Sequence, residues 1–277
     1  MVRLSDRMRG GFMKEKISLI QMDVELGQVE RNYKKAVQLM ELALEDKPDI
    51  LVLPETVNTG FFPSPDSALY AASDADGVQT KKVFGAFAKE HGVNIVAGSV
   101  SVLENGSVFN RSYIFDRKGE VVASYDKIHG FSPMGETKSY TGGSSTVHFT
   151  LDGIACSMAI CYDVRFCELI RTEALQGVDL FFLPAAWPLV RKEHWITLSK
   201  ARAIENQMFF CAVNECGRAG STQYGGNSML LSPLGEELLH LREKEQVATA
   251  EIDTDVLQGI RESINVFRDR RPELYHL

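Results

Sequence analysis

Apolar and polar residues alternate in two distinct rhythms along the chain. In the first hundred residues, compact apolar runs over 16–22, 49–53 and 93–102 predict buried strands. Between them, apolar side chains recur every three or four positions over 28–45 and 78–91, the spacing of helices with one apolar face. Strands that alternate with helices in this way are typical of helices packed on a sheet.

After residue 102 the apolar period shortens toward two, which predicts antiparallel strands joined by tight turns. One hairpin is expected over 107–124, and another at Asp152–Gly153, a dipeptide that favours two-residue turns. A loop rich in Gly, Pro and Ser is expected over 127–143. The other expected elements are helices over 165–176, 191–206 and 254–262, and strands over 145–150, 154–160, 178–183, 207–214, 227–231, 236–241 and 246–252. Two mixed sheets packed face to face, with helices outside, satisfy both rhythms and give an α/β fold of the α+β type.

The composition is that of an acidic globular protein. The chain has 277 residues, of which 44% are hydrophobic and 24% charged, and its formal net charge is −7. This balance argues against a nucleic-acid binder, which carries a basic face, and against a polybasic membrane anchor. The apolar runs are strand-sized, so no membrane span is expected. Residues 1–13 lack the apolar segment of a secretory signal and are interpreted as a loose leader, with Met1 or Met13 as the start.

Five cysteines, an odd number, argue against a disulfide framework and favour a reducing, cytoplasmic location. Cys161 stands out because it ends an apolar strand and precedes a helical stretch. There, helix N–H groups and the helix dipole would favour its thiolate, the nucleophilic form. The other four have ordinary interpretations as core or incidental residues, with Cys216 in a turn region where it could be exposed: Cys156, Cys167, Cys211 and Cys216.

A nucleophilic thiol needs a base, and the sequence offers two kinds. His129, in the long loop, is the best partner among six histidines for a papain-like pair. Glu55 directly follows an apolar strand, where burial would suit a carboxylate to act as a base near neutral pH. Lys127 follows another strand and could hold the negative charge of a tetrahedral intermediate. No histidine lies in a metal-binding pattern such as His-Glu-x-x-His, so no metal is expected.

Three short blocks carry a family resemblance. The blocks 53–56 (LPET), 125–129 (YDKIH) and 160–166 (ICYDVRF) resemble the signature blocks of the nitrilase superfamily, the carbon–nitrogen hydrolases. Their order suits that family, and so do the separations of 72 and 34 residues between Glu55, Lys127 and Cys161. The segment 201–206 (ARAIEN) matches a further block. Since the resemblance covers nearly the whole chain, it implies a single domain over 14–277 that ends in a C-terminal tail.

The resemblance implies a Glu–Lys–Cys catalytic set that needs no cofactor and no metal. Glu55 would be the general base, and Cys161 would attack an amide carbon to form a thioester. Lys127 and the backbone N–H of Tyr162 would stabilise the oxyanion. Glu136, in the loop after the lysine, is the candidate for a second active-site glutamate.

The resemblance also implies a fold and an assembly. Family members are αββα sandwiches that associate through their helical faces, so a homodimer or small homo-oligomer is expected, with the stretch 261–277 crossing to a partner. Many relatives have Pro where this chain has Cys167. Four charges are interpreted as structural and paired, with the third and fourth close enough on one helix for an ion pair: Arg165, Glu168, Arg202 and Glu205.

The expected substrate is a small amide. The blocks 161–166 and 184–188 (PAAWP) are similar to those of the amidase branch that contains bacterial ω-amidases. This implies hydrolysis of an ω-amido acid, such as 2-oxoglutaramate or 2-oxosuccinamate, to the acid and ammonia. Trp187 is either a wall of the substrate pocket or a core aromatic residue. The alternatives are a deaminated-glutathione amidase, an aliphatic amidase, an N-carbamoylase, a nitrilase, or a scaffold without activity.

Overall fold

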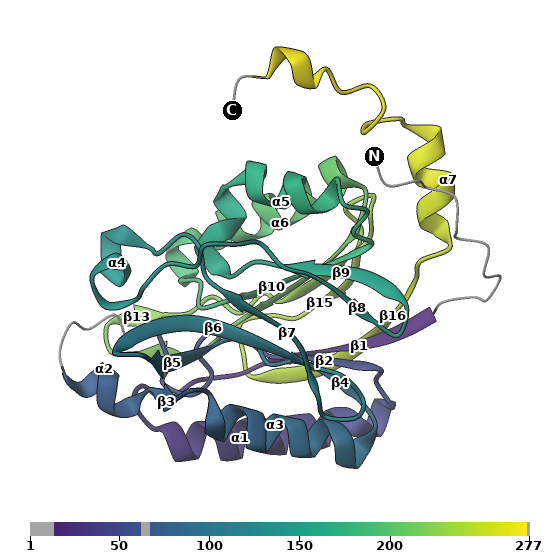
Figure 1. Cartoon of the computed structure of the whole chain (residues 1–277). Helices are drawn as coiled ribbons and strands as arrows, with labels where there is room; N and C mark the ends of the chain where they lie inside the picture. Colours follow the sequence, from purple (N-terminus) through teal and green to yellow (C-terminus); the bar gives the residue numbers. More distant parts are fainter. Residues whose placement is uncertain (1–13, 62–66, 276–277) are drawn as a thin grey trace.

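Two β-sheets pack face to face with helices on their outer surfaces, which confirms the predicted αββα sandwich (Figure 1). The computed structural model describes residues 14–61 and 67–275, so the leader expected over 1–13 lies outside the described residues. Helices α1 (Val29–Ala43) and α3 (Val78–His91) cover the first sheet. Helices α5 (Cys167–Ala174) and α6 (Lys192–Asn206) cover the second.

The first sheet has eight strands in the described chain, in the order β16-β1-β2-β4-β6-β5-β3, with β7 also paired to β6. Strands β1, β2 and β4 run parallel to one another, while β16, β6 and β7 pair antiparallel to their neighbours. Its strands are β1 (Lys14–Gln21), β2 (Ile50–Val52), β3 (Asp74–Ala75), β4 (Asn94–Val96), β5 (Val100–Glu104), β6 (Ser107–Phe115), β7 (Val121–Asp126) and β16 (Gln246–Asp253).

The second sheet has six strands in the described chain, in the order β15-β14-β11-β10-β9-β8. Its central strands β9, β10 and β11 are parallel, and hairpins add antiparallel strands on both sides. Its strands are β8 (His148–Leu151), β9 (Ile154–Met158), β10 (Leu180–Ala185), β11 (Phe209–Asn214), β14 (Met229–Leu231) and β15 (Glu237–His240). Both sheets are therefore mixed, as the combination of βα units and hairpins predicted.

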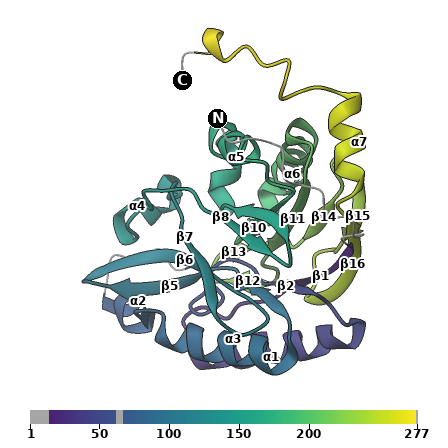
Figure 2. The same cartoon turned by 45° about the vertical axis from the view of Figure 1, so that its right-hand side comes forward.

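Short elements connect these layers. Helix α7 lies along one edge of the molecule, and residues 264–275 pass over the side of α5 and α6 (Figure 2). The remaining elements are the hairpin β12 (Arg218–Ala219) and β13 (Thr222–Gln223), helices α2 (Ser67–Ala72), α4 (Glu136–Ser139) and α7 (Val256–Ser263), and the 3-10 turns η1 (Leu44–Asp46), η2 (Ser132–Met134), η3 (Cys161–Arg165), η4 (Leu189–Arg191) and η5 (Pro272–Leu274).

Strand alternation divides the core into two layers. In β1, Ile17 and Leu19 point between the sheets, whereas Ile20 points toward α1 and α3. In β2, Val52 and Leu51 make the same division. Because successive side chains of a strand face opposite ways, a strand covered on both faces must be apolar throughout, and this explains the continuous apolar runs.

The sequence predicted one continuous strand where the structure has two. The run over 93–102 is broken into β4 and β5 at Gly98, whose φ is +63°. A Cβ atom at Gly98 would lie 1.7 Å from the carbonyl oxygen of Pro54. The backbone thus turns at Gly98 because it passes directly against the segment that leads into Glu55.

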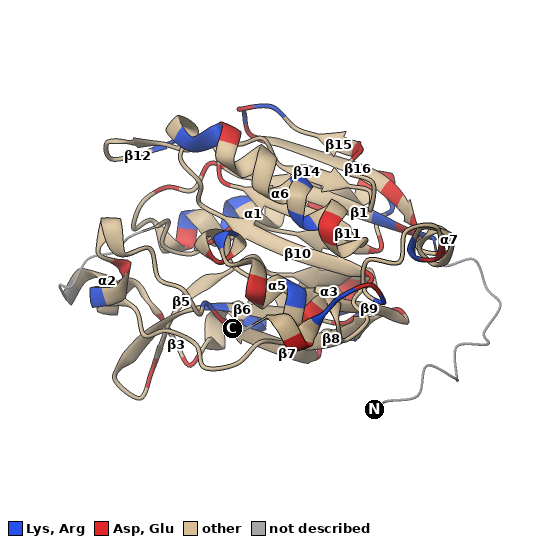
Figure 3. Ribbon diagram, turned by 90° about the horizontal axis from the view of Figure 1, so that it is seen from above, with Lys and Arg blue, Asp and Glu red and all other residues tan. Residues whose placement is uncertain are grey.

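Charges are dispersed over the helices and the sheet edges, with Lys and Arg interspersed among Asp and Glu (Figure 3). This pattern agrees with the acidic net charge and shows no gathering of basic residues on the face in view. Across residues 14–61 and 67–275, the helices are all too short or too polar to cross a membrane.

Candidate active site

Glu55, Lys127 and Cys161 converge at one end of the two sheets. Glu55 lies three residues beyond β2, Lys127 directly follows β7, and Cys161 begins the turn η3 after β9. Their exposed fractions are only 0%, 3% and 8%. Sheets of this kind place ligands at the carboxyl ends of parallel strands, and β2 and β9 both end here.

The Lys127 ammonium is shared between two glutamates. Its Nζ atom lies 2.8 Å from Glu55 Oε1, 2.9 Å from Glu136 Oε1 and 2.8 Å from Glu136 Oε2. Glu136 is fully buried and is the first residue of α4, a short helix within the segment that the sequence presented as a loop. The structure therefore brings together the three residues of the predicted catalytic set and the predicted second glutamate.

The charges of this cluster set the protonation of Lys127. Burial alone would lower the pKa of Lys127, but attraction by Glu55, Glu136 and Cys161 raises it well above its usual range. These charges therefore favour the ammonium form of the lysine.

The surroundings of Cys161 favour its protonated thiol. Burial, and then the negative charge of Glu55, raises the pKa of Cys161 well above its usual range, although Lys127 opposes the shift. This corrects the expectation of a thiolate favoured by a helix, because Cys161 begins a 3-10 turn and the α-helix starts only at Cys167. A protonated thiol beside a carboxylate suits general-base chemistry, in which the proton leaves as the sulfur attacks.

The Cys161 elbow is held by the side chain of Asp163. Cys161 has a φ of +48°, a conformation that residues other than glycine seldom adopt. Asp163 is fully buried and accepts hydrogen bonds from the Ile160 N–H at 3.0 Å and the Tyr125 hydroxyl at 2.8 Å. These bonds join the elbow to the end of β7, two residues before Lys127.

His129 forms hydrogen bonds with Asp163 rather than with the Cys161 thiol. Its backbone N–H and Nδ1 lie 2.9 and 2.8 Å from Asp163 Oδ1. Its ring stacks on Phe166, with centroids 3.6 Å apart. The papain-like alternative is therefore not supported, because the histidine is engaged away from Cys161.

Two contacts of Glu55 could not be anticipated from the sequence. Glu55 Oε2 accepts a hydrogen bond from the backbone N–H of Ala186 at 2.7 Å, and Oε1 accepts one from Asn110 Nδ2 at 2.8 Å. The available signal for Asn110 is its place on the buried side of β6, between Val108 and Ser112. An asparagine in such a row needs buried polar partners.

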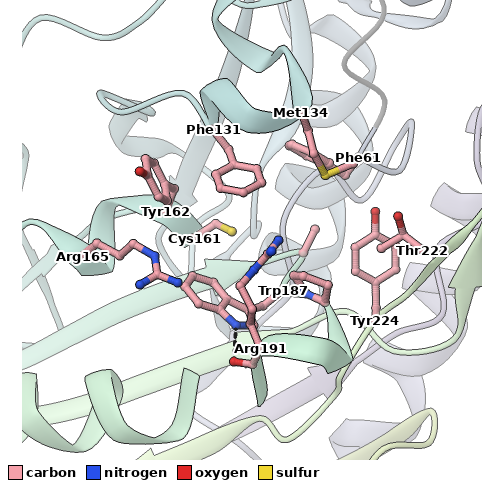
Figure 4. Close-up of a pocket in the computed structure, with 12 residues that line it drawn as sticks. Phe61, Phe131, Met134, Cys161, Tyr162, Arg165, Trp187, Arg191, Thr222 and Tyr224 are labelled. Atoms are coloured by element: carbon pink, nitrogen blue, oxygen red, sulfur yellow. Dashed lines mark hydrogen bonds between the residues drawn. The ribbon is translucent and has the colours of Figure 1, made fainter. Parts of the chain in front are cut away.

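A cavity opens above Cys161 (Figure 4). Its walls combine five aromatic side chains with smaller apolar ones and two arginines, and no Asp or Glu is among the lining residues of the described chain. The lining comprises Phe61, Phe131, Met134, Cys161, Tyr162, Arg165, Ala186, Trp187, Pro188, Arg191, Thr222 and Tyr224. The apolar walls, with a few polar groups among them, suit a small organic molecule.

The two arginines lie on either side of Trp187 in the view of Figure 4. Arg165 Cζ lies 4.9 Å from the Trp187 ring centroid, and Arg165 Nη2 lies 3.2 Å from His194 Nδ1. Arg191 Cζ lies 5.1 Å from the Phe131 ring. Within the described segments, neither guanidinium forms an ion pair with a carboxylate. The interpretation of Arg165 as a paired structural charge was therefore wrong, whereas Arg202 and Glu205 do form the expected pair at 2.7 Å.

Trp187 is both a wall of the cavity and a core residue. It is 3% exposed, its ring centroid lies 5.8 Å from that of Trp195, and its Nε1 donates to the Arg191 carbonyl at 2.8 Å. This hydrogen bond from the Trp187 ring holds the backbone of Arg191 in place.

The remaining cysteines are free thiols. Cys156 and Cys211 are core residues, as predicted, and Cys167 is exposed. Cys216, which the sequence suggested could be exposed, is buried, because its backbone forms a parallel bridge with Asp23 just beyond β1 and its N–H donates to the Met22 carbonyl. In the part of the chain that the structure describes, no three His, Cys, Asp or Glu side chains form a group that could hold a metal ion.

Comparisons with known proteins agree with this geometry. The family model for carbon–nitrogen hydrolases matches residues 16–262. The chain is 41% identical to the 2-oxoglutaramate amidase of Bacillus subtilis over 95% of this chain and 100% of that protein. It is 30% identical to the omega-amidase NIT2-A of Xenopus laevis over 95% and 98%. A carbon–nitrogen hydrolase superfamily protein of Xanthomonas campestris, solved with an arsenic adduct in its active site, superposes with a TM-score of 0.87 at 29% identity over 96% and 99%. The chain therefore belongs to the carbon–nitrogen hydrolase family, an enzyme family within the nitrilase superfamily, as its three sequence blocks predicted.

Proposed function

We propose that this enzyme hydrolyses a small ω-amido acid, with 2-oxoglutaramate as the preferred substrate, to the dicarboxylic acid and ammonia. The observation that carries the proposal is the joint placement of Cys161 and two arginines without carboxylate partners in one cavity. The cysteine supplies a nucleophile for the amide, and the arginines supply charge for a carboxylate at the other end of the molecule.

The first half of the reaction forms a thioester. Glu55 takes the thiol proton as Cys161 attacks the amide carbon, and the C–S bond forms while the carbonyl oxygen becomes an oxyanion. The Lys127 ammonium and the Tyr162 N–H stabilise this oxyanion. Glu55 then delivers its proton to the amide nitrogen, the C–N bond breaks, and ammonia leaves.

The second half returns the enzyme to its starting state. Glu55 removes a proton from water, the hydroxide attacks the thioester carbon, and the C–S bond breaks. The thiolate recovers the proton, and the carboxylic acid departs. Glu136 stays hydrogen-bonded to Lys127 throughout, which keeps the ammonium directed at the oxyanion. No cofactor or metal takes part in these steps.

Charge complementarity supports the choice of substrate. A guanidinium binds a carboxylate through two parallel hydrogen bonds, and the neighbouring oxo group of a 2-oxo acid offers a further acceptor for the second arginine. The Trp187 ring provides a flat wall for the carbon chain. Similarity to proteins named 2-oxoglutaramate amidase and omega-amidase favours the same substrate class.

An ammonia-release assay tests the substrate. We expect 2-oxoglutaramate to be hydrolysed with a higher kcat/KM than propionamide, deaminated glutathione, N-carbamoyl amino acids or nitriles. Activity confined to nitriles or to N-carbamoyl compounds would reject the proposal, and no turnover of any member would favour a scaffold.

Arginine variants test the recognition of the carboxylate. Loss of a charge-assisted hydrogen bond in Arg191→Gln is expected to lower kcat/KM for 2-oxoglutaramate about 10- to 100-fold, while propionamide, which has no carboxylate, is unaffected. Lys192→Gln is the matched control, since Lys192 is the next residue and pairs with Glu243. An equal loss of kcat/KM on both substrates would show that Arg191 does not bind the substrate carboxylate.

The proposal includes the setting of the enzyme. We infer a single domain over 14–277, a cytoplasmic location and a homodimer or small homo-oligomer. Five unpaired thiols support a reducing compartment. Exposed apolar side chains on the outer helical layer, Leu175 and Ile204, support association through that face, which sedimentation velocity would measure.

A further inference from the structure

Asn110 joins the two glutamates of the site through one amide group. It lies in the middle of β6 and is 1% exposed. Its Nδ2 atom is 2.8 Å from Glu55 Oε1 and 3.2 Å from Glu136 Oε1. Its backbone carbonyl accepts the Lys127 N–H at 2.9 Å. Asn110 therefore contacts all three charged residues that surround the thiol, although it belongs to none of the sequence blocks.

Charge balance explains why a donor is needed there. Two carboxylates, Glu55 and Glu136, share the single ammonium of Lys127 in a site that excludes water, so one negative charge is left without a counter-ion. Two like charges this close repel, and the repulsion is strong in a medium of low dielectric constant. An amide has two N–H groups and can give one to each carboxylate without adding charge.

The orientation of the amide follows from the same contacts. Asn110 Oδ1 has no hydrogen-bond partner in the described structure. A rotated amide would place this oxygen against two carboxylates, so the donor side is held toward Glu55 and Glu136 by those residues themselves.

We propose that Asn110 is a positioning residue that bridges Glu55 and Glu136 and thereby keeps Glu55 ionised and aimed at the Cys161 thiol. The proposal rests on the proposed role of Glu55 as the general base. Without the bridge, Glu55 loses a donor that favours its charged form, and it is protonated at higher pH than in the wild type.

The test compares Asn110→Ala with Asn94→Ala. Asn94 is a matched control because it is also 1% exposed, lies in the same sheet and shares its Nδ2 between a carboxylate and a carbonyl, at the far end from the site. Asn110→Ala is expected to lower kcat about 10- to 100-fold, with KM changed by less than about twofold. The acid limb of its pH profile should move up by about one pH unit. Asn94→Ala should keep the wild-type kcat and pH profile.

Two further substitutions at Asn110 distinguish loss of the bridge from misfolding of the protein. Asn110→Asp has the same shape but replaces the donors with a third negative charge, so its kcat should fall further than that of Asn110→Ala. Asn110→Ser keeps one donor and should be intermediate. A folded Asn110→Ala or Asn110→Asp enzyme with wild-type kcat and an unmoved acid limb would overturn the proposal.

A measurement without substrate separates this proposal from the proposed function. In protein labelled with ¹³C at glutamate carboxyl carbons, the Glu55 signal, assigned with Glu55→Gln, should titrate at higher pH in Asn110→Ala than in wild type. If this shift appears and no ω-amide is hydrolysed, the bridge stands and the substrate assignment fails. If the titration is unchanged, the bridge fails whatever the substrate is.

Discussion

Thr56 and Cys161 share a backbone conformation that residues with a Cβ atom rarely adopt. Their φ values are +47° and +48°, and Thr56 directly follows Glu55. Such conformations cost about 1–3 kcal/mol each and persist where surrounding contacts fix them. Thr56 is held by a hydrogen bond from its N–H to Ser99 Oγ at 2.9 Å, and the Cys161 elbow is held by Asp163. Strained backbone, stabilised by buried polar groups, thus lies beside Glu55 and at Cys161, the two residues that react.

The raised pKa of Cys161 predicts how its alkylation depends on pH. A thiol whose pKa is raised well above its usual range gains thiolate only as the pH rises. In a Cys167→Ser background, which removes the exposed thiol, iodoacetamide should alkylate Cys161 at a rate that still rises between about pH 7 and 10. Substrate should protect Cys161, and Cys161→Ala should abolish the label. A rate that levels off below about pH 8 would indicate a preformed thiolate instead.

At this scale the sequence identified residues that follow strand ends, and the structure places them together. Glu55, Lys127 and Cys161 could be selected because each follows a predicted strand and belongs to a family block. Asn110 and Arg191 could not, because their partners depend on the register between β6 and β7 and on the fold of the turn η4. Neither the register between two strands nor the direction of a side chain in a turn can be predicted from a single sequence.

At the scale of elements, periodicity predicted most helices and strands within a few residues. Helix α3 begins and ends where its apolar spacing does, at Val78 and His91. Failures arose where a contact from elsewhere overrides local preference, as at Gly98, or where a short turn was too brief to show a period, as in α4.

Replacement of Gly98 tests the contact between β4 and the segment before Glu55. In Gly98→Ala the new methyl group would meet the Pro54 carbonyl at 1.7 Å, so the backbone must move. We expect a loss of unfolding free energy of about 2 kcal/mol or more, together with a lower kcat because Pro54 precedes Glu55. Urea denaturation and the ammonia assay would measure the two effects.

Gly92 provides the matched control for this experiment. Its φ of +64° is nearly that of Gly98, at +63°, but no atom lies within 4 Å of a Cβ built there. Gly92→Ala should therefore show the cost of the backbone conformation alone, with kcat unchanged. Equal destabilisation of the two variants would contradict the close approach to Pro54.

At the scale of the whole molecule, a charged network at the far end ties the two sheets together. Arg117, in the turn after β6, lies 2.7 Å from both Asp49 and Asp152, which precede β2 and β9. Glu15 of β1 lies 3.7 Å from the same guanidinium. Because three carboxylates share the single positive charge of Arg117, the negative charge of Glu15 is only partly neutralised. Burial, and then repulsion by Asp49 and Asp152, raises the pKa of Glu15 to about 7.

This shift predicts a slope in stability. An acid with a raised pKa binds its proton more tightly in the folded state, so stability falls as pH rises from 4.5, its ordinary pKa, toward about 7. Glu15→Gln removes this slope. It should raise Tm relative to the wild type at pH 8, and the difference should shrink toward pH 4.5. Glu251→Gln, which alters an exposed pair with Lys14 on the neighbouring strand, is the control and should not reproduce the pattern.

The burial of Cys161 limits which amides in a mixture can reach its sulfur atom. The sulfur lies in a cavity with apolar and aromatic walls, and only 8% of the residue is exposed. An amide must therefore arrive as the free end of a small molecule that enters whole. We expect a glutamine or asparagine side chain on a folded protein, which carries its backbone with it, to be excluded from the sulfur. The architecture thus allows a reactive amide-cleaving centre to work among proteins rich in amide side chains without damaging them.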